Sequence, residues 1–90
     1  MLTTQIDAIE ARLHEAVEHA DDQGLFINSY LHGHFDVVVS HTLRHDDADL
    51  ALLDQCMQES LQSAFANNEL EAQDQSQVFA LWQSLIKSVS

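Results

Sequence analysis

Apolar residues recur along most of the chain at intervals of three and four, the spacing that places side chains on one face of an α-helix. In the first segment they include Leu2, Ile6, Ile9, Leu13 and Val17, with the charged residues on the other side. The same spacing returns in two later segments, at Leu50, Leu53, Met57, Leu61, Ala64 and Phe65, and at Val78, Phe79, Leu81, Trp82, Leu85, Ile86 and Val89. The pattern predicts helices over about residues 2–20, 25–43 and 48–66, and from residue 72 onward.

Short polar breaks separate these segments: "ADDQG", "RHDDAD" and "NNEL". We expect Gly24 to close the first helix, and Asp46 or Asp47 to cap the third. Because the connections are short, consecutive helices should pack antiparallel. A chain of 90 residues is long enough for one domain. The prediction is an all-α fold, an antiparallel up-down-up-down four-helix bundle, forming a single domain over residues 1–90.

The composition supports helix and restricts the possible partners. There is no proline, there are only two glycines, and the formal net charge is −12. Such a charge repels nucleic-acid phosphates and anionic lipid, so we expect neither nucleic acid nor membrane as a partner. A single cysteine, Cys56, and the lack of a signal-peptide pattern favour a cytoplasmic location.

The stretch "YLHGHFDVVVSH", residues 30–41, raises the question of a site because it holds three histidines. On a helical wheel, His32 falls on the polar side, whereas His34 and His41 fall within the apolar arc. That apolar side comprises Phe26, Ile27, Tyr30, Leu31, Phe35, Val37 and Val38. Two inward-facing imidazoles need hydrogen-bond partners. A serine, a tyrosine hydroxyl or a backbone carbonyl could serve, and a ligand pocket or a metal site remain as alternatives.

Metal binding is the least favoured of these alternatives. His34 and His41 are two turns apart, too far to share one ion, and His45 is expected to lie beyond the end of the helix. His14 and His19 point in different directions on the first helix and are expected at the surface. We therefore predict no metal site, no cofactor and no catalytic residue.

Gly33 lies at the edge of the apolar arc, where a missing side chain would let a large ring approach. Counting along the second and fourth helices places Trp82 at the same level. We expect Trp82 to pack near Gly33, with Tyr30 and His34 beside it. The candidate pocket then comprises Tyr30, Gly33, His34, His41 and Trp82.

Several of these residues carry a resemblance to a known family. "GLFxxxYLxGHF" over residues 24–35, "NEL" at 68–70, "DQ" at 74–75 and "LW" at 81–82 resemble the YfcL family of small bacterial helical proteins. One departure is the start of the fourth helix, where Glu71–Ala72 stands in place of an expected serine–proline. The resemblance implies a helical fold and a bacterial origin, and it carries over no activity and no site residue.

An enzyme is not expected, because no nucleophile, base and orienting group form a recognisable set. The favoured hypothesis is a small acidic helical module that binds another protein or itself. Apolar residues that the core leaves over motivate it: Leu25, Val39, Leu43 and Leu52. The alternative is a small-molecule or metal pocket between the second and fourth helices, near His34 and Trp82.

Overall fold

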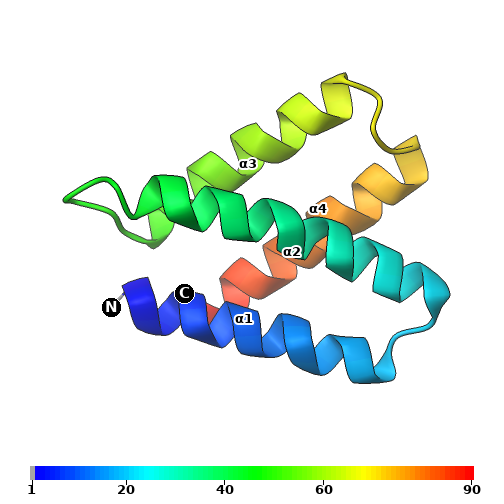
Figure 1. The fold of residues 1–90 in the computed structure, drawn as a ribbon, viewed down its shortest axis with the longest axis horizontal. Coiled ribbons are helices and arrows are strands. Elements are labelled where there is room, and N and C mark those ends of the chain that lie inside the picture. The colour runs from blue at the N-terminus through cyan, green and yellow to red at the C-terminus, as the bar shows by residue number, and fades with distance from the viewer. Residues whose placement is uncertain (1) are drawn as a thin grey trace.

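The computed structural model describes residues 2–90, which form four helices. They are α1 (Leu2–His19), α2 (Asp22–Thr42), α3 (Leu50–Ala66) and α4 (Ala72–Val89), coloured from blue to red in Figure 1. Residues 2–90 contain no strand. The all-α class and the number of helices are therefore confirmed, and α4 begins where the sequence predicts.

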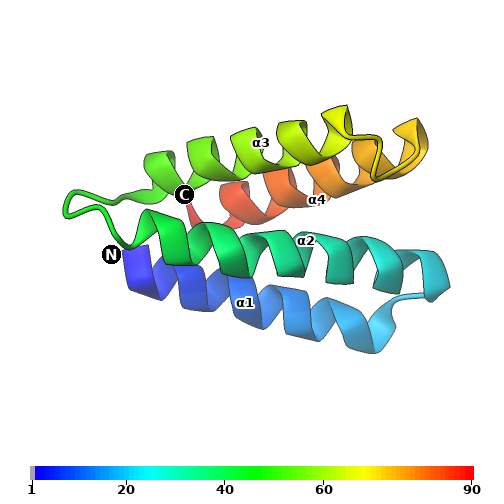
Figure 2. The same ribbon diagram turned by 45° about the horizontal axis from the view of Figure 1, so that its top comes forward.

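The chain reverses direction from each helix to the next, and the pair α1–α2 is inclined to the pair α3–α4 (Figures 1 and 2). Gln5 Nε2 donates to the Val89 carbonyl at 3.1 Å, which joins the start of α1 to the end of α4. Gln23 Nε2 donates to Asp74 Oδ1 at 2.8 Å, which joins the starts of α2 and α4. Helices α2 and α4 each pack against the other three helices, and α2 makes the more extensive contacts of the two, so it is the central element of the fold.

One apolar core holds the helices together. Its fully buried side chains are Ile9, Leu13, Leu31, Phe35, Leu53, Met57, Leu61, Val78 and Trp82. Burying each large apolar side chain contributes about 1.5–3 kcal/mol. Two polar groups inside the core have partners: Trp82 Nε1 donates to Asp54 Oδ1 at 2.8 Å, and Thr42 Oγ1 donates to the Val38 carbonyl at 2.8 Å. The buried Asn28 Oδ1 has no hydrogen-bond partner among residues 2–90. The core thus includes residues of all four helices, as the helical spacing predicts.

The helix ends correct two predictions. Gly24 does not close α1, because it lies in the first turn of α2, where its N–H donates to Oδ1 of the capping residue Asp21 at 2.8 Å. Asp49 caps α3 by accepting from the Leu52 N–H at 2.9 Å, so neither Asp46 nor Asp47 is the cap. Helix α4 begins after Glu71, whose side chain makes no capping hydrogen bond.

The turn after α3 depends on Asn68, which has a left-handed backbone with φ of 59°. The Asn68 N–H donates to the Phe65 carbonyl at 3.0 Å, and the Glu69 N–H donates to the Ala64 carbonyl at 3.4 Å. These two bonds form the Schellman pattern that satisfies the last carbonyls of a helix. The turn buries Leu70 against the core and leaves Glu69 exposed.

Among residues 2–90, none of the helices combines the length and the apolar character needed to cross a membrane.

Candidate functional site

His34 lies half-buried on the side of α2 that faces α3. Its Nδ1 is 3.1 Å from Ser60 Oγ of α3, and its ring centroid is 4.7 Å from that of Tyr30. A serine partner is one of the structural alternatives that the sequence left open for this histidine. His34 therefore links α2 to α3 at the edge of the core.

Tyr30 connects the same face of α2 to the turn between α3 and α4. Its hydroxyl donates to Glu69 Oε1 at 2.9 Å. Burial, and then the hydrogen bond to Glu69 and its negative charge, raise the pKa of Tyr30 to about 12. The phenol therefore remains a hydrogen-bond donor to a higher pH than an ordinary tyrosine, whose pKa is 10.

Gly33 has open space above it, which corrects the prediction that Trp82 covers it. A Cβ added at Gly33 would meet no heavy atom within 4 Å among residues 2–90, its own helix backbone and chain neighbours aside. Trp82 is instead fully buried, with its ring centroid 6.0 Å from that of Phe35. Helix α4 therefore places Trp82 beside Phe35 and not over Gly33.

His41 is exposed, which corrects the prediction of an inward-facing imidazole. It lies one residue before the end of α2, and its neighbour Thr42 is fully buried. At this end of α2, the other helices therefore cover a smaller part of the helix circumference than the helical wheel predicts. His34 and Tyr30 are adjacent in the structure, whereas Trp82 and His41 lie elsewhere.

A row of uncharged residues, half-buried at Tyr30 and exposed at its other positions, runs along α2 beside His34. We call Phe26, Tyr30, Gly33 and Val37 the outer stripe; their intervals are four, three and four residues. Phe26 is 46% exposed and Val37 is 58% exposed, so the prediction that both face the core is wrong. Phe26 also lies beside Tyr30, with the ring centroids 6.5 Å apart.

A shallow groove of about 460 Å³ opens along the outer stripe, between α2 and α3. It is lined by Ser29, Tyr30, Gly33, His34, Val37 and Ser60. None of these is a carboxylate or a permanently charged group, although the chain has a formal net charge of −12. The groove is thus an uncharged strip on an acidic protein.

Most of the apolar residues that the sequence assigned to an interaction patch are less exposed than that prediction requires. Leu25, Val39 and Leu52 are half-buried, and Val39 packs against the core. Only Leu43, which is 49% exposed, is as accessible as that prediction requires. The helical wheel predicts the exposed apolar surface on the wrong side of α2, because a wheel does not show which side the neighbouring helices cover.

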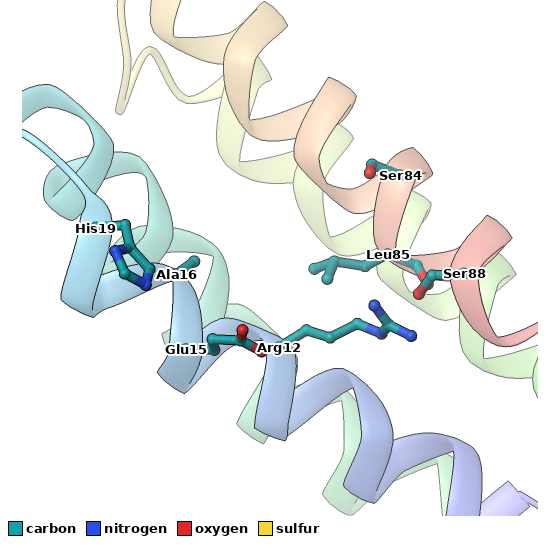
Figure 3. Close-up of a pocket in the computed structure, with 7 residues that line it drawn as sticks. All are labelled: Arg12, Glu15, Ala16, His19, Ser84, Leu85 and Ser88. Atoms are coloured by element: carbon teal, nitrogen blue, oxygen red, sulfur yellow. The ribbon is translucent and has the colours of Figure 1, made fainter.

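A second opening, of about 310 Å³, lies between α1 and α4. It is lined by Arg12, Glu15, Ala16, His19, Ser84, Leu85 and Ser88 (Figure 3). Figure 3 shows the Arg12 side chain extending toward Ser88, while His19 lies at the far end of the opening. The polar groups are spread along the opening and do not converge on one point, so we take the outer stripe as the candidate site.

Fold and surface together define a small acidic four-helix protein whose central helix presents an uncharged face to solvent. The family model described as "YfcL protein" matches residues 3–87. The chain is also 31% identical over 74 residues to "Uncharacterized protein YfcL" of Escherichia coli (strain K12), covering 82% of this chain and 80% of that protein. The chain belongs to the YfcL family, as its motifs indicate. No solved structure matches it.

Proposed function

We propose that this protein is a cytoplasmic binding module, not an enzyme, which recognises a basic partner helix through the outer stripe. In this proposal, the four helices form an antiparallel up-down-up-down bundle, and α2 and α3 together form the binding face. The observation that carries the proposal is Gly33, an exposed glycine in the middle of α2 with open space above it.

Glycine inside a helix destabilises it by about 0.8–1.0 kcal/mol relative to alanine. Nothing within residues 2–90 packs into the space above Gly33, so no contact inside the chain offsets that cost. A partner side chain inserted between Tyr30 and Val37 would meet the helix backbone directly. The glycine is then the floor of a binding site, and its cost to α2 is offset when the partner binds.

The spacing of the outer stripe fits a helix as the partner. Intervals of four, three and four residues repeat the seam along which two helices pack. An amphipathic helix laid in such a groove places its anchors at matching intervals. The large exposed side chains, Phe26 and Val37, stand on either side of Gly33 and define where a bulky apolar anchor would enter.

Charge determines the chemistry of that helix. One carboxylate contacts the stripe, that of Glu69, which is bonded to Tyr30, and Glu59 precedes the groove residue Ser60 in the chain. A partner with lysine or arginine flanking its apolar anchor complements them. A second copy of this chain would also carry a formal net charge of −12, and the two copies would repel each other. We therefore favour a different protein over a homodimer. The same acidity disfavours nucleic acid as the ligand.

Site-specific photocrosslinking in bacterial cells tests the proposal. A photoreactive amino acid replaces Val37 in the outer stripe, and a matched variant carries it at Val17, which is 43% exposed on α1. We expect the Val37 probe, and not the Val17 probe, to crosslink to a lysine- or arginine-rich helical segment of another protein. Crosslinks from Val37 only to a second copy of the chain, or identical products from both positions, contradict the proposal.

Salt provides an independent test of the charge argument. Raising the ionic strength from about 0.1 M to about 1 M shortens the Debye length from about 10 Å to about 3 Å. The yield of the Val37 crosslink should fall over this range, because the flanking charges no longer attract the partner. A yield that is constant or rises with salt indicates a purely apolar partner and excludes the basic helix.

A further inference from the structure

Four metal-ligating side chains meet between α1 and α2, away from the outer stripe. Glu10 and His14 are one helical turn apart on α1, and His32 and Asp36 are one turn apart on α2. Ligand atoms of Glu10, His32 and Asp36 all lie within 4.8 Å of one another. His32 Nε2 is 3.6 Å from Asp36 Oδ1. The His14 ring stands edge-on to the His32 ring, with centroids 5.3 Å apart and planes at 87°.

The backbone beneath this cluster is held firmly. Ile9 and Leu13 of α1, and Leu31 and Phe35 of α2, alternate with the four polar residues and are fully buried. One turn from His32, the buried Asn28 donates from Nδ2 to the Leu13 carbonyl at 2.9 Å. Packing and this hydrogen bond fix the register of the two helices, so the cluster needs only side-chain rotation to close on an ion.

We propose that Glu10, His32 and Asp36 bind one divalent transition-metal ion, for which Zn²⁺ has the best-fitting chemistry. Bonds of about 2.0–2.2 Å to histidine nitrogen and carboxylate oxygen place tetrahedral ligand atoms about 3.3 Å apart. The 3.6 Å separation of His32 and Asp36 is already close to that value. His14 or a water molecule takes the fourth position. The bound ion links α1 to α2 and stabilises the hairpin that they form.

The donor set distinguishes among cations. Imidazole suits zinc, nickel and copper, whereas magnesium and calcium prefer oxygen ligands alone. The sequence predicted no metal site, because His34 and His41 are too far apart to share an ion and His45 was expected beyond the end of the helix. It also placed His14 and His32 at the surface. The cluster between α1 and α2 leads us to revise that prediction. This proposal is independent of the outer stripe, because the cluster faces α1 and not α3.

Calorimetric titration of ZnCl₂ into the metal-free 90-residue chain tests the proposal. We expect one Zn²⁺ per chain. The affinity should fall at least about 100-fold in His32→Ala and in Asp36→Asn, since even the loss of a group that only supports a ligand costs 10–100-fold. His19→Ala is the matched control, because His19 is an exposed histidine of α1 that lies outside the cluster. The affinity of this variant for Zn²⁺ should equal the wild-type value.

Thermal unfolding, monitored by circular dichroism, separates binding from folding. Zn²⁺ should raise the Tm of the wild type and of His19→Ala, and leave the Tm of His32→Ala and Asp36→Asn unchanged, because only a ligand that binds the folded state stabilises it. A large excess of Mg²⁺ should not compete. The proposal is overturned if the wild type shows no saturable site, or if folded Asp36→Asn and His19→Ala bind Zn²⁺ equally well.

Discussion

Helix α2 carries two apolar rows whose surroundings are opposite. The inner row is Ile27, Leu31, Phe35 and Val38, all buried against the other three helices. The outer stripe, which begins one residue earlier at Phe26, faces solvent over an uncharged groove. Both rows have helical spacing, so periodicity marks apolar faces without telling which one the fold covers. The uncovered row leaves apolar area that the core does not use, and the proposed partner would bind there.

Two phenylalanines give the largest expected difference between the rows. Phe35 is fully buried beside Trp82, so Phe35→Ala should destabilise the protein by about 3–5 kcal/mol. Phe26 is 46% exposed, so Phe26→Ala should cost less than about 1 kcal/mol. Urea denaturation followed by circular dichroism measures both free energies of unfolding. Equal losses would mean that the outer stripe is part of the core.

The two glycines of α2 should respond in different ways to alanine. Gly33→Ala is expected to raise the free energy of unfolding by about 0.8–1.0 kcal/mol, because the added Cβ meets only open space. Gly24→Ala should bring no such gain, because its Cβ would lie 3.0 Å from Ala20 Cβ and 3.2 Å from Asp21 Oδ1. The same urea experiment compares them. A destabilised Gly33→Ala variant would show that a contact inside the chain needs the glycine.

The turn that positions Glu69 near Tyr30 gives a comparably small effect. Asn68 has a left-handed backbone, which costs a residue with a branched side chain about 1–2 kcal/mol. Asn68→Val should therefore destabilise the protein by that amount, whereas Asn68→Gly should be neutral or slightly stabilising. Thermal unfolding of both variants provides the measurement. If valine is tolerated as well as glycine, the Schellman turn does not set the stability of this end.

Tyr30 offers a spectroscopic test of the outer stripe, because it is the only tyrosine in the chain. Its tyrosinate absorbance should appear with a midpoint near pH 12, and Glu69→Gln should lower that midpoint toward 10 without reaching it, because burial is the largest cause of the raised pKa. A pKa raised on folding stabilises the protein below pH 10, and this contribution is lost as the pH rises to about 12. A wild-type midpoint at 10 would mean that Tyr30 is solvated and not bonded to Glu69.

Much of the fold could be predicted from intervals of three and four residues, because burial of apolar faces determines where helices form. The start of α4 at Ala72 followed from the spacing of apolar residues and the polar break before it. Asp49 as the cap of α3 did not, because "RHDDADL" holds several aspartates that are equally suitable caps.

The sites could be predicted less well, because they depend on neighbours that a wheel does not contain. A serine was one of three hydrogen-bond partners predicted as possible for His34, whereas the exposure of His41 and the absence of Trp82 above Gly33 were not predicted. The cluster of Glu10, His32 and Asp36 was missed for the same reason. Each pair spaced four residues apart is unremarkable alone, and only the register of α1 against α2 brings the pairs together.

Replacing Gly33 by leucine tests most directly the claim that the outer stripe is a binding site. The variant fills the open space with a side chain, and we expect it to be more stable than the wild type by about 0.5–1 kcal/mol, from helix propensity. The yield of the Val37 crosslink to the basic partner should nevertheless fall by at least about tenfold, equivalent to 1.4 kcal/mol of binding free energy. A Gly33→Leu protein that crosslinks to the partner as well as the wild type does would contradict the account.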